Sequence, residues 1–284
     1  MKRLYISDLD GTLLTSQQTV AEKSAEILNR CIGEGAYFTF ATARSVYSAK
    51  PMTESININV PCILMNGVSI YDLENDKYIK NEFIPAQACE EIINVFESYD
   101  VRCFMYKICK EVLTAHFTEM NSEVMRQFAQ ERKRKFRKPF VQCQRFEKAD
   151  DIVYFTTTGE HGLLLPLKKE IDLINGADCA FYEDTYTGEW YLEVFSSRAS
   201  KYNGVKFLSE KYGFEQITCF GDNLNDIPMF NASDYRVAVE NAKPEVKELA
   251  DDVTASNNED GVALWLEKNC KTINNRNISF RYNI

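Results

Sequence analysis

The sequence predicts an α/β fold in which a parallel-sheet core is interrupted by an inserted domain. Short apolar runs alternate with helical segments at both ends of the chain, which favours parallel strands joined by helices. The middle segment differs, because it has the pattern of a separate α+β unit. The length of 284 residues suggests about two domains. We therefore expect a Rossmann-like core at residues 1–84 and 192–284, and an α/β insertion at residues 85–191.

The first part of the core is predicted to alternate strands and helices and to end in a hairpin. The runs read as strands cover residues 4–7, 37–41, 62–65, 68–72 and 78–83. A helix is expected between the first two strands. Thr19 and Glu22 have the spacing of a capping box at its start, and Gly33 and Gly35 can end it.

The second part of the core returns to this alternation. Its predicted helices cover residues 201–212, 224–230, 244–250 and 261–268, and its strands cover residues 217–220, 235–239 and 252–254. Ser200 is the expected N-cap of the first of these helices, and Gly213 is its stop signal. The polar residues from Asn269 onward carry no predicted element.

The insertion is predicted to have the order α-β-β-α-β-α-β-β. Its helices cover residues 86–99, 118–136 and 163–174, and its strands cover residues 101–106, 111–115, 152–156, 179–182 and 190–195. The second helix leads into a basic stretch at residues 132–138. A solvated helix face is the usual explanation of such a stretch, and a patch that attracts an anionic partner is the alternative.

Composition excludes several classes of protein. The 33 basic and 42 acidic residues give a net charge of −9, which argues against a nucleic-acid or anionic-membrane binder. No run approaches the ~20 apolar residues of a membrane span, and the N-terminus lacks the apolar region of a signal peptide. The nine cysteines include no CxxC pair, so we expect reduced thiols in a cytoplasmic protein. The sequence predicts no oligomeric state.

Polar residues follow several of the predicted core strands. Asp8, Thr42, Asn66 and Asp222 each stand just past the end of such a strand. The carboxyl ends of the strands in a doubly wound sheet share one edge, where ligands bind. We therefore expect these residues to meet despite their separation along the chain.

Asp8 and Asp10 form the first chemical motif, which reads Asp-Leu-Asp-Gly-Thr. Residues two apart in an extended segment face the same way, and Gly11 lets the chain turn behind the two carboxylates. Adjacent carboxylates are unfavourable without a cation, and oxygen ligands suit Mg²⁺. A surface Asp-Gly turn is the alternative interpretation.

A second polar motif occupies residues 221–226, between a predicted strand and a predicted helix. Asp222 can supply a third carboxylate to the metal, while Asn225 and Asp226 can brace the loop or a ligand. A capped helix start is the alternative, but it explains only one of the four polar residues.

Thr42, Ala43 and Arg44 form a third candidate site. A hydroxyl and main-chain N–H groups at a strand-to-helix turn suit a phosphate, although a capped helix start explains the pattern equally well. Lys201 is the fourth candidate, because a lysine at a helix N-terminus is unfavourable unless an anion is present. A solvent-exposed side chain remains the common explanation of any single lysine.

These motifs resemble those of the haloacid dehalogenase superfamily of aspartate-nucleophile phosphatases, and most closely its Cof-type members with a subclass IIB cap. Residues 8–12 match the DxDGT motif and residues 221–226 match GDxxND, while Thr42 and Lys201 stand at the second and third motifs. Their order and the cap-sized gap also agree. Two positions depart from the pattern. Ala43 replaces a usual glycine, and Gly204 follows Lys201 only after two other residues.

The resemblance implies an Mg²⁺-dependent phosphatase that hydrolyses a small phosphorylated metabolite, with a sugar phosphate as the first candidate. Asp8 would be the nucleophile that forms an aspartyl-phosphate, and Asp10 the general acid and base. The Asp8 carboxylate, the Asp10 main-chain carbonyl and Asp222 would hold Mg²⁺. The residues implied in substrate binding are Thr42, Ala43, Arg44, Lys201 and Asn225. The inserted domain would act as a cap that closes over the site.

The alternative function is a non-hydrolytic phospho-acceptor or regulatory binding protein with the same acidic metal site. Receiver domains use a similar set of residues, but they lack the inserted cap and the aspartate two positions after the acceptor. Asp10 therefore favours turnover. A metal-independent dehalogenase of the same superfamily is a further alternative, against which Asp10 and Asp222 argue.

Overall fold

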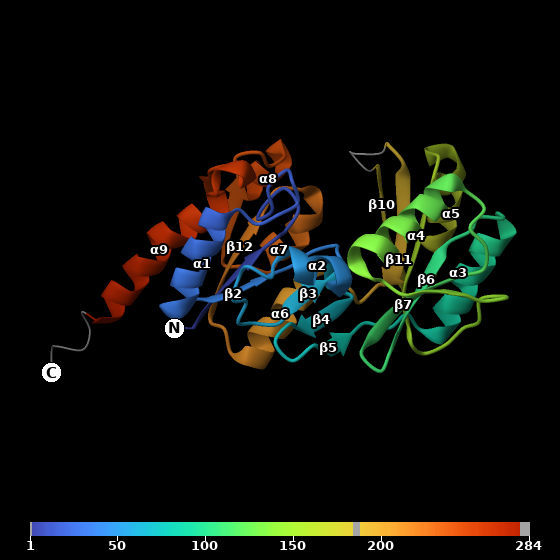
Figure 1. The fold of residues 1–284 in the computed structure, drawn as a ribbon, viewed down its shortest axis with the longest axis horizontal. Coiled ribbons are helices and arrows are strands. Elements are labelled where there is room, and N and C mark those ends of the chain that lie inside the picture. Colours follow the sequence, from blue (N-terminus) through green and yellow to red (C-terminus); the bar gives the residue numbers. More distant parts are fainter. Residues whose placement is uncertain (1, 184–187, 279–284) are drawn as a thin grey trace. The chain divides into compact units, whose positions relative to one another are not determined.

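The computed structural model describes residues 2–183 and 188–278, which belong to two compact units (Figure 1). The first unit consists of Met1–Ile79 with Ser200–Ile284, and the second of Lys80–Ala199. The boundaries expected from the sequence, at residues 85 and 191, lie inside the second unit. The expected boundary at residue 191 falls inside strand β11, which runs unbroken from Trp190 to Ser196 and belongs wholly to the second unit. A capping role for the second unit stays a prediction.

The first unit is built on a five-stranded parallel sheet, which confirms the predicted fold class. The strand order is β14-β13-β12-β1-β2, and every neighbouring pair is parallel. The strands are β1 (Arg3–Ser7), β2 (Tyr37–Phe40), β12 (Gln216–Gly221), β13 (Tyr235–Val239) and β14 (Asp252–Thr254). Leu4, Tyr5 and Ile6 are all buried, because the central strand of such a sheet is covered on both faces.

Helices cover the two faces of this sheet (Figure 1). On one face α1 packs beside α9, whose Trp265 ring contacts the rings of Tyr5 and Phe220. On the other face α6 packs beside α7. The helices of this unit are α1 (Glu22–Gly33), α2 (Val46–Met52), α6 (Lys201–Tyr212), α7 (Ile227–Asn231), α8 (Pro244–Leu249) and α9 (Gly261–Ile278).

A small sheet extends the first unit beyond β2. Its strands are β3 (Cys62–Leu64), β4 (Ser69–Asp72) and β5 (Lys77–Asn81), and a parallel bridge joins Ala41 to Ile63. Short 3₁₀ turns complete the unit: η1 (Met65–Gly67), η2 (Leu224–Asp226) and η3 (Asn257–Glu259).

Three features of the first unit differ from the sequence prediction. A helix was expected after the turn at Thr42, but without bounds; it is the short α2, which contains Pro51, a residue that disfavours helix interiors. The predicted capping box is wrong, because α1 starts with Ala21 as its N-cap and no side-chain hydrogen bond. The Thr19 carbonyl instead accepts the main-chain N–H of Thr15 at 2.9 Å and closes a turn. Helix α9 also continues past residue 268, and residues 279–284 lie outside the described chain.

The second unit contains a six-stranded sheet in the order β10-β11-β9-β6-β7-β8. Its elements are α3 (Ala86–Ser98), β6 (Phe104–Cys109), β7 (Val112–Phe117), α4 (Glu123–Phe136), β8 (Phe140–Gln142), β9 (Ile152–Gly159), α5 (His161–Ile171), β10 (Ala177–Glu183) and β11. Phe155, Leu192 and Val194 belong to a buried core shared with α3 and α5. The sequence did not predict β8, a short strand that pairs in parallel with β7.

The basic stretch at residues 132–138 lies at the end of α4 and just beyond it. Lysines and arginines in a last helical turn are stabilised by the helix dipole. The Arg132 guanidinium lies 3.4 Å from the centre of the Phe128 ring. Lys138 is buried, with its ammonium 4.1 Å from the centre of the Tyr106 ring, and this burial lowers the pKa of Lys138 to about 7. These two residues pack against aromatic rings, so the stretch is not a uniformly solvated face.

No helix among residues 2–183 and 188–278 is long and apolar enough to cross a membrane. All nine cysteines have free thiols.

Candidate active site

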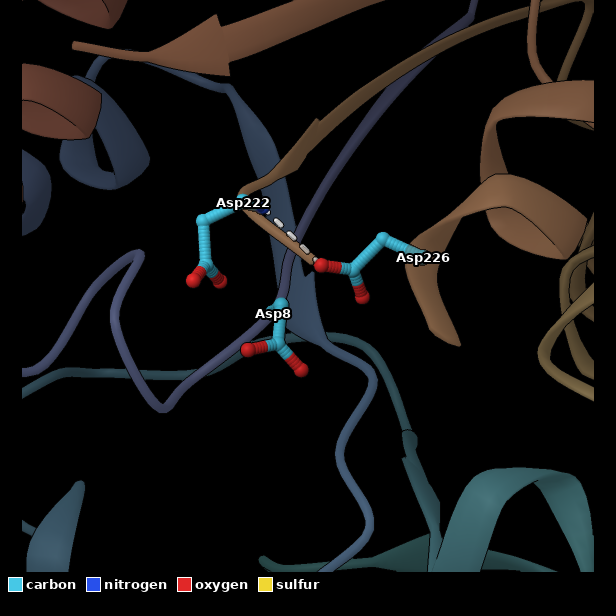
Figure 2. A group of neighbouring side chains, drawn as sticks. All are labelled: Asp8, Asp222 and Asp226. Carbon is cyan, nitrogen blue, oxygen red and sulfur yellow. Dashed lines mark hydrogen bonds between the residues drawn. The ribbon is translucent and has the colours of Figure 1, made fainter. Parts of the chain in front are cut away.

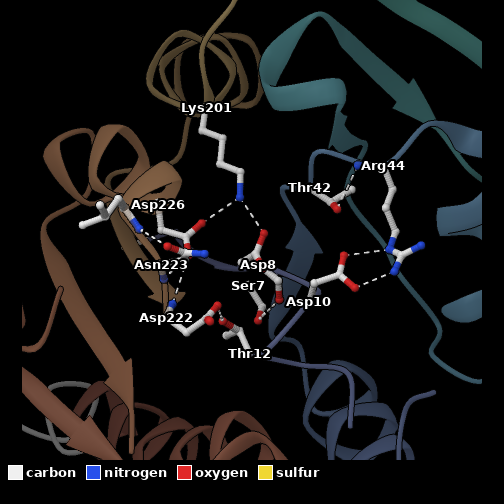
Figure 3. A network of polar contacts seen from close by, with 11 residues as sticks. Ser7, Asp8, Asp10, Thr12, Thr42, Arg44, Lys201, Asp222, Asn223 and Asp226 are labelled. Atoms are coloured by element: carbon white, nitrogen blue, oxygen red, sulfur yellow. Dashed lines mark hydrogen bonds and ion pairs between the residues drawn. The ribbon is translucent and has the colours of Figure 1, made fainter. Parts of the chain in front are cut away.

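The carboxyl edge of the parallel sheet collects polar residues from distant parts of the sequence (Figure 3). Asp8 follows β1, Asp222 follows β12, and Thr42 lies beyond the end of β2. These three strands are adjacent, so the residues that follow them are neighbours. Asn66, which follows β3, donates its main-chain N–H to the Thr42 carbonyl at 2.9 Å. All four residues therefore lie at the edge where the sequence predicted them.

Lys201 links the residue that follows β1 to the loop that follows β12, because it binds both Asp8 and Asp226. Its ammonium lies 2.5 Å from Asp8 Oδ1 and 2.7 Å from Asp226 Oδ1, and its side chain is only 1% exposed. Burial opposes the charge on Lys201, but the carboxylates of Asp226 and Asp8 outweigh this and raise the pKa of the lysine. Ser200 holds the start of α6 in place, since its hydroxyl accepts the main-chain N–H of Asn203 at 3.0 Å. Lys201 is therefore a buried, charged residue.

Asp226 anchors the loop that carries Asp222. One of its oxygens accepts the Lys201 ammonium, and the other accepts the main-chain N–H groups of Asp222 and Asn223, at 3.0 and 3.1 Å. A Cβ at Gly221 would lie 2.7 Å from the Asp226 Cβ, so the close approach requires glycine. The sequence analysis named Asp226 as a residue that can brace the loop or a ligand, but it did not predict the bond to Lys201. The place of Asp226 at the end of the polar motif at residues 221–226 was the available signal.

The turn after Asp8 is in close contact with the Asp222 carboxylate. Thr12 donates its hydroxyl to Asp222 Oδ1 at 2.8 Å. Gly11 has a φ of +78°, and a Cβ there would lie 2.5 Å from Asp222 Oδ2. Only glycine combines this backbone conformation with such a close approach. The predicted turn at Gly11 therefore also sets the position of Asp222.

Asp8, Asp222 and Asp226 bring three carboxylates together (Figure 2). One oxygen from each lies within 4.8 Å of the other two. Burial, reinforced by the negative charge of Asp226, raises the pKa of Asp8 well above its usual value and that of Asp222 to about 6. Three carboxylates and the Lys201 ammonium sum to a charge of −2 when ionised. The group could hold a divalent cation.

The hydrogen bonds show which of these carboxylates suit a cation best. Both oxygens of Asp226 already accept hydrogen bonds from within the protein. Asp8 and Asp222 each accept one such bond among the described residues. We therefore expect Asp8 and Asp222 to supply the ligand oxygens and Asp226 to position them. The predicted contribution of the Asp10 main-chain carbonyl stays a prediction.

Asp10 and Arg44 form a separate pair at the rim of the site (Figure 3). The guanidinium donates to both carboxylate oxygens, from Nε at 2.7 Å and from Nη2 at 2.6 Å. The Arg44 main-chain N–H donates to Thr42 Oγ1 at 3.1 Å. The hydroxyl hydrogen of Thr42 is therefore available to another acceptor. The side chain of Arg44 binds Asp10 in this structure, and the predicted part of Arg44 in substrate binding stays a prediction.

Two further predicted residues lie nearby. Ala43 stands between Thr42 and Arg44 in the turn that precedes α2, and Asn225 is exposed in η2, next to Asp226. Their part in phosphate binding stays a prediction.

The fold and the site together define an α/β protein with a group of aspartates, able to hold a cation, at the carboxyl edge of a parallel sheet. Residues 5–266 match the family model of haloacid dehalogenase-like hydrolases, so the chain belongs to that family. This confirms the resemblance inferred from the four motifs. The family and the phosphatases among its relatives show that the chain is a phosphoric monoester hydrolase.

Phosphatases of named activity match the chain over nearly its whole length. A 5-amino-6-(5-phospho-D-ribitylamino)uracil phosphatase of Bacillus subtilis is 23% identical over 269 residues, which cover 93% of this chain and 96% of that protein. A pyridoxal phosphate phosphatase of Escherichia coli is 24% identical over 274 residues, with coverages of 93% and 97%. A crystal structure of a Thermotoga maritima protein, 27% identical, superposes with a TM-score of 0.76 and covers 94% of this chain and 97% of its own.

Replacing Asp226 tests the buried ion network. Asp226→Asn should lower the free energy of unfolding by about 3–5 kcal/mol, because it leaves the buried Lys201 ammonium short of a partner. The measurement is urea denaturation at pH 7. Asp76→Asn is the matched control, since it breaks an exposed ion pair with Lys50 and should cost less than about 1 kcal/mol. Equal, small losses in both variants would contradict the network.

A pair of glycine variants separates backbone strain from the contact with Asp222. Gly11 and Gly213 both have left-handed backbones, but a Cβ at Gly213 would meet no atom within 4 Å. Either change to alanine should cost about 1–2 kcal/mol for the backbone alone. Gly11→Ala should cost more, because it also displaces the Asp222 carboxylate. An equal loss in the free energy of unfolding of both variants, measured by urea denaturation, would show that the contact with Asp222 does not affect stability.

Proposed function

We propose that the protein is an Mg²⁺-dependent phosphatase that hydrolyses a small phosphorylated metabolite through an aspartyl-phosphate on Asp8. One observation carries the proposal: the Asp8 carboxylate is buried between a lysine that binds one of its oxygens and the Asp222 carboxylate. Lys201 binds Oδ1 and thereby orients the Asp8 carboxylate for its attack on phosphorus. The buried surroundings also exclude competing water from the nucleophile.

Asp10 serves as the general acid and base in this proposal. It gives a proton to the departing alkoxide and later takes one from the water that hydrolyses the aspartyl-phosphate. Its side chain is 47% exposed, and Arg44 holds both of its oxygens in one orientation. A half-exposed carboxyl at the rim can reach a leaving group that the buried Asp8 does not contact.

The carboxylates of Asp8 and Asp222, with the Asp10 main-chain carbonyl, would hold Mg²⁺. When bound, the cation offsets the charges of Asp8 and of the phosphoryl group, which otherwise repel each other. Oxygen ligands of this kind suit a small hard cation, and the net charge of −2 on the group matches a divalent ion.

Thr42, Lys201 and Asn225 would hold the phosphoryl oxygens, with the Ala43 and Arg44 segment as the supporting turn. Thr42 can donate outward, because its oxygen already accepts the Arg44 N–H. The Lys201 ammonium stands beside the nucleophile, where negative charge concentrates during transfer.

The substrate class is a small phosphorylated metabolite. A sugar phosphate is the first candidate, and the named activities of the relatives add a phosphoribitylamino-uracil and pyridoxal phosphate. We place the enzyme in the cytoplasm, because its nine cysteines are unpaired. Hydrolysis rates over a panel of phosphorylated metabolites would rank these candidates.

Removal of the nucleophile is the direct test of the mechanism. Asp8→Asn should lower kcat for 4-nitrophenyl phosphate with Mg²⁺ by about 10³-fold or more, because the amide cannot form the intermediate. Asp251→Asn, a change in an ion pair with Arg236 outside the site, is the control and should retain activity. Full activity in purified Asp8→Asn would refute the assignment. A wild-type protein that accumulates phosphate on Asp8 without releasing it would instead support the phospho-acceptor alternative.

Cation binding should depend on pH. The Asp222 carboxyl has a pKa of about 6, so at pH 5 most of it is protonated and must lose that proton before it binds Mg²⁺. The dissociation constant for Mg²⁺ should therefore be at least about tenfold higher at pH 5 than at pH 7.5, since Asp8, whose pKa is also raised, competes for protons as well. Calorimetric titration at both pH values, in buffers of different ionisation enthalpy, also measures the released proton. An unchanged dissociation constant would contradict this view of Asp222.

A further inference from the structure

The turn that carries the catalytic motif is held from outside by two asparagines. Asn241 follows β13 and donates its side-chain amide to the Gly11 carbonyl at 2.7 Å. Asn257, in η3, donates its side-chain amide to the Leu14 carbonyl at 2.8 Å in a buried position. The two are also linked, because the Asn257 main-chain N–H donates to Asn241 Oδ1 at 2.9 Å. Two linked asparagines thus hold the turn at two points, the carbonyls of Gly11 and Leu14.

The inner side of the same turn faces the acidic group. Gly11 lies against the Asp222 carboxylate, and Thr12 donates its hydroxyl to it. Within the turn, the Leu9 carbonyl accepts the N–H groups of Thr12, Leu13 and Leu14. The carbonyls of Gly11 and Leu14 accept the amides of the two asparagines. Any outward movement of the turn would draw Thr12 away from Asp222.

We infer that Asn241 and Asn257 are positioning residues of the active site, which clamp the turn at residues 9–14 against Asp222 and so preset the cation ligands. The inference rests on the proposed function for its catalytic consequence, but not for its effect on cation binding. Their side chains bond to the main chain of the turn and of η3, so both act through the turn. Residues that orient ligands in this way affect affinity even though they do not touch the ion.

The chain supplies a matched control for this clamp. Asn258 is the next residue in η3 and also bonds to the chain that follows the turn, since its amide oxygen accepts the Ser16 N–H at 2.9 Å. Its amide nitrogen donates to Ser16 Oγ at 2.9 Å. This contact is exposed and lies beyond Leu14, so it does not bear on Gly11 or Thr12. Asn258→Ala therefore removes a similar contact without releasing the turn.

The test compares Asn241→Ala, Asn257→Ala and Asn258→Ala in the full-length protein. Calorimetric titration with Mg²⁺ should show affinity about 10- to 100-fold weaker in the first two variants and within twofold of wild type in the third. With 4-nitrophenyl phosphate at saturating Mg²⁺, kcat should fall in the first two variants more than KM rises. Partial unfolding alone would also lower kcat at unchanged KM, but in the calorimetric titration it would lower the binding stoichiometry and not the affinity for Mg²⁺.

Two outcomes would overturn the inference. Wild-type Mg²⁺ affinity and kcat in both Asn241→Ala and Asn257→Ala would overturn it, and so would equal losses in all three variants. If Asn257→Ala does not fold, the exposed Asn241→Ala decides the question alone. A wild-type protein that binds Mg²⁺ but hydrolyses no phosphate ester would defeat the proposed function. The Mg²⁺ affinities of the three variants would still decide whether the two asparagines position the turn.

Discussion

The buried ammonium of Lys201 between Asp8 and Asp226 is the interaction on which the rest of the site depends. A charge removed from water is very unfavourable unless partners surround it, and here each partner comes from a different part of the chain. The three groups are mutually required, because the loss of any one leaves unpaired charge in the interior. The network therefore ties β1, α6 and the loop after β12 into one arrangement.

Backbone conformation supplies the second constraint. Two glycines stand where a side chain would collide with a carboxylate: Gly11 against Asp222 and Gly221 against Asp226. These close approaches let main-chain N–H groups and a threonine hydroxyl satisfy the acids directly. The acidic group is thereby organised before a cation or substrate arrives, which lowers the cost of reorganisation during the reaction.

Much of the site could be predicted from the sequence. Asp8, Thr42 and Asp222 were identified because polar residues after apolar strands mark the carboxyl edge of a parallel sheet, and the structure places them there. Asp226 was given only a bracing role, because its bond to Lys201 spans 25 positions and local sequence does not reveal it. The predicted capping box failed for a related reason. The Thr19 carbonyl is engaged in a turn with Thr15, which local spacing does not reveal.

The sequence by itself determined the fold class, the order of the strands along the chain and the chemical identity of the active groups. These follow from local patterns, since strand periodicity and turn residues act over a few positions. Only the tertiary structure decided the pairing: Arg44 with Asp10, Lys201 with Asp226, and the two asparagines with the turn after Asp8. Such pairs join residues that are 25 to 243 positions apart, and packing, rather than local pattern, selects which of many polar groups meet.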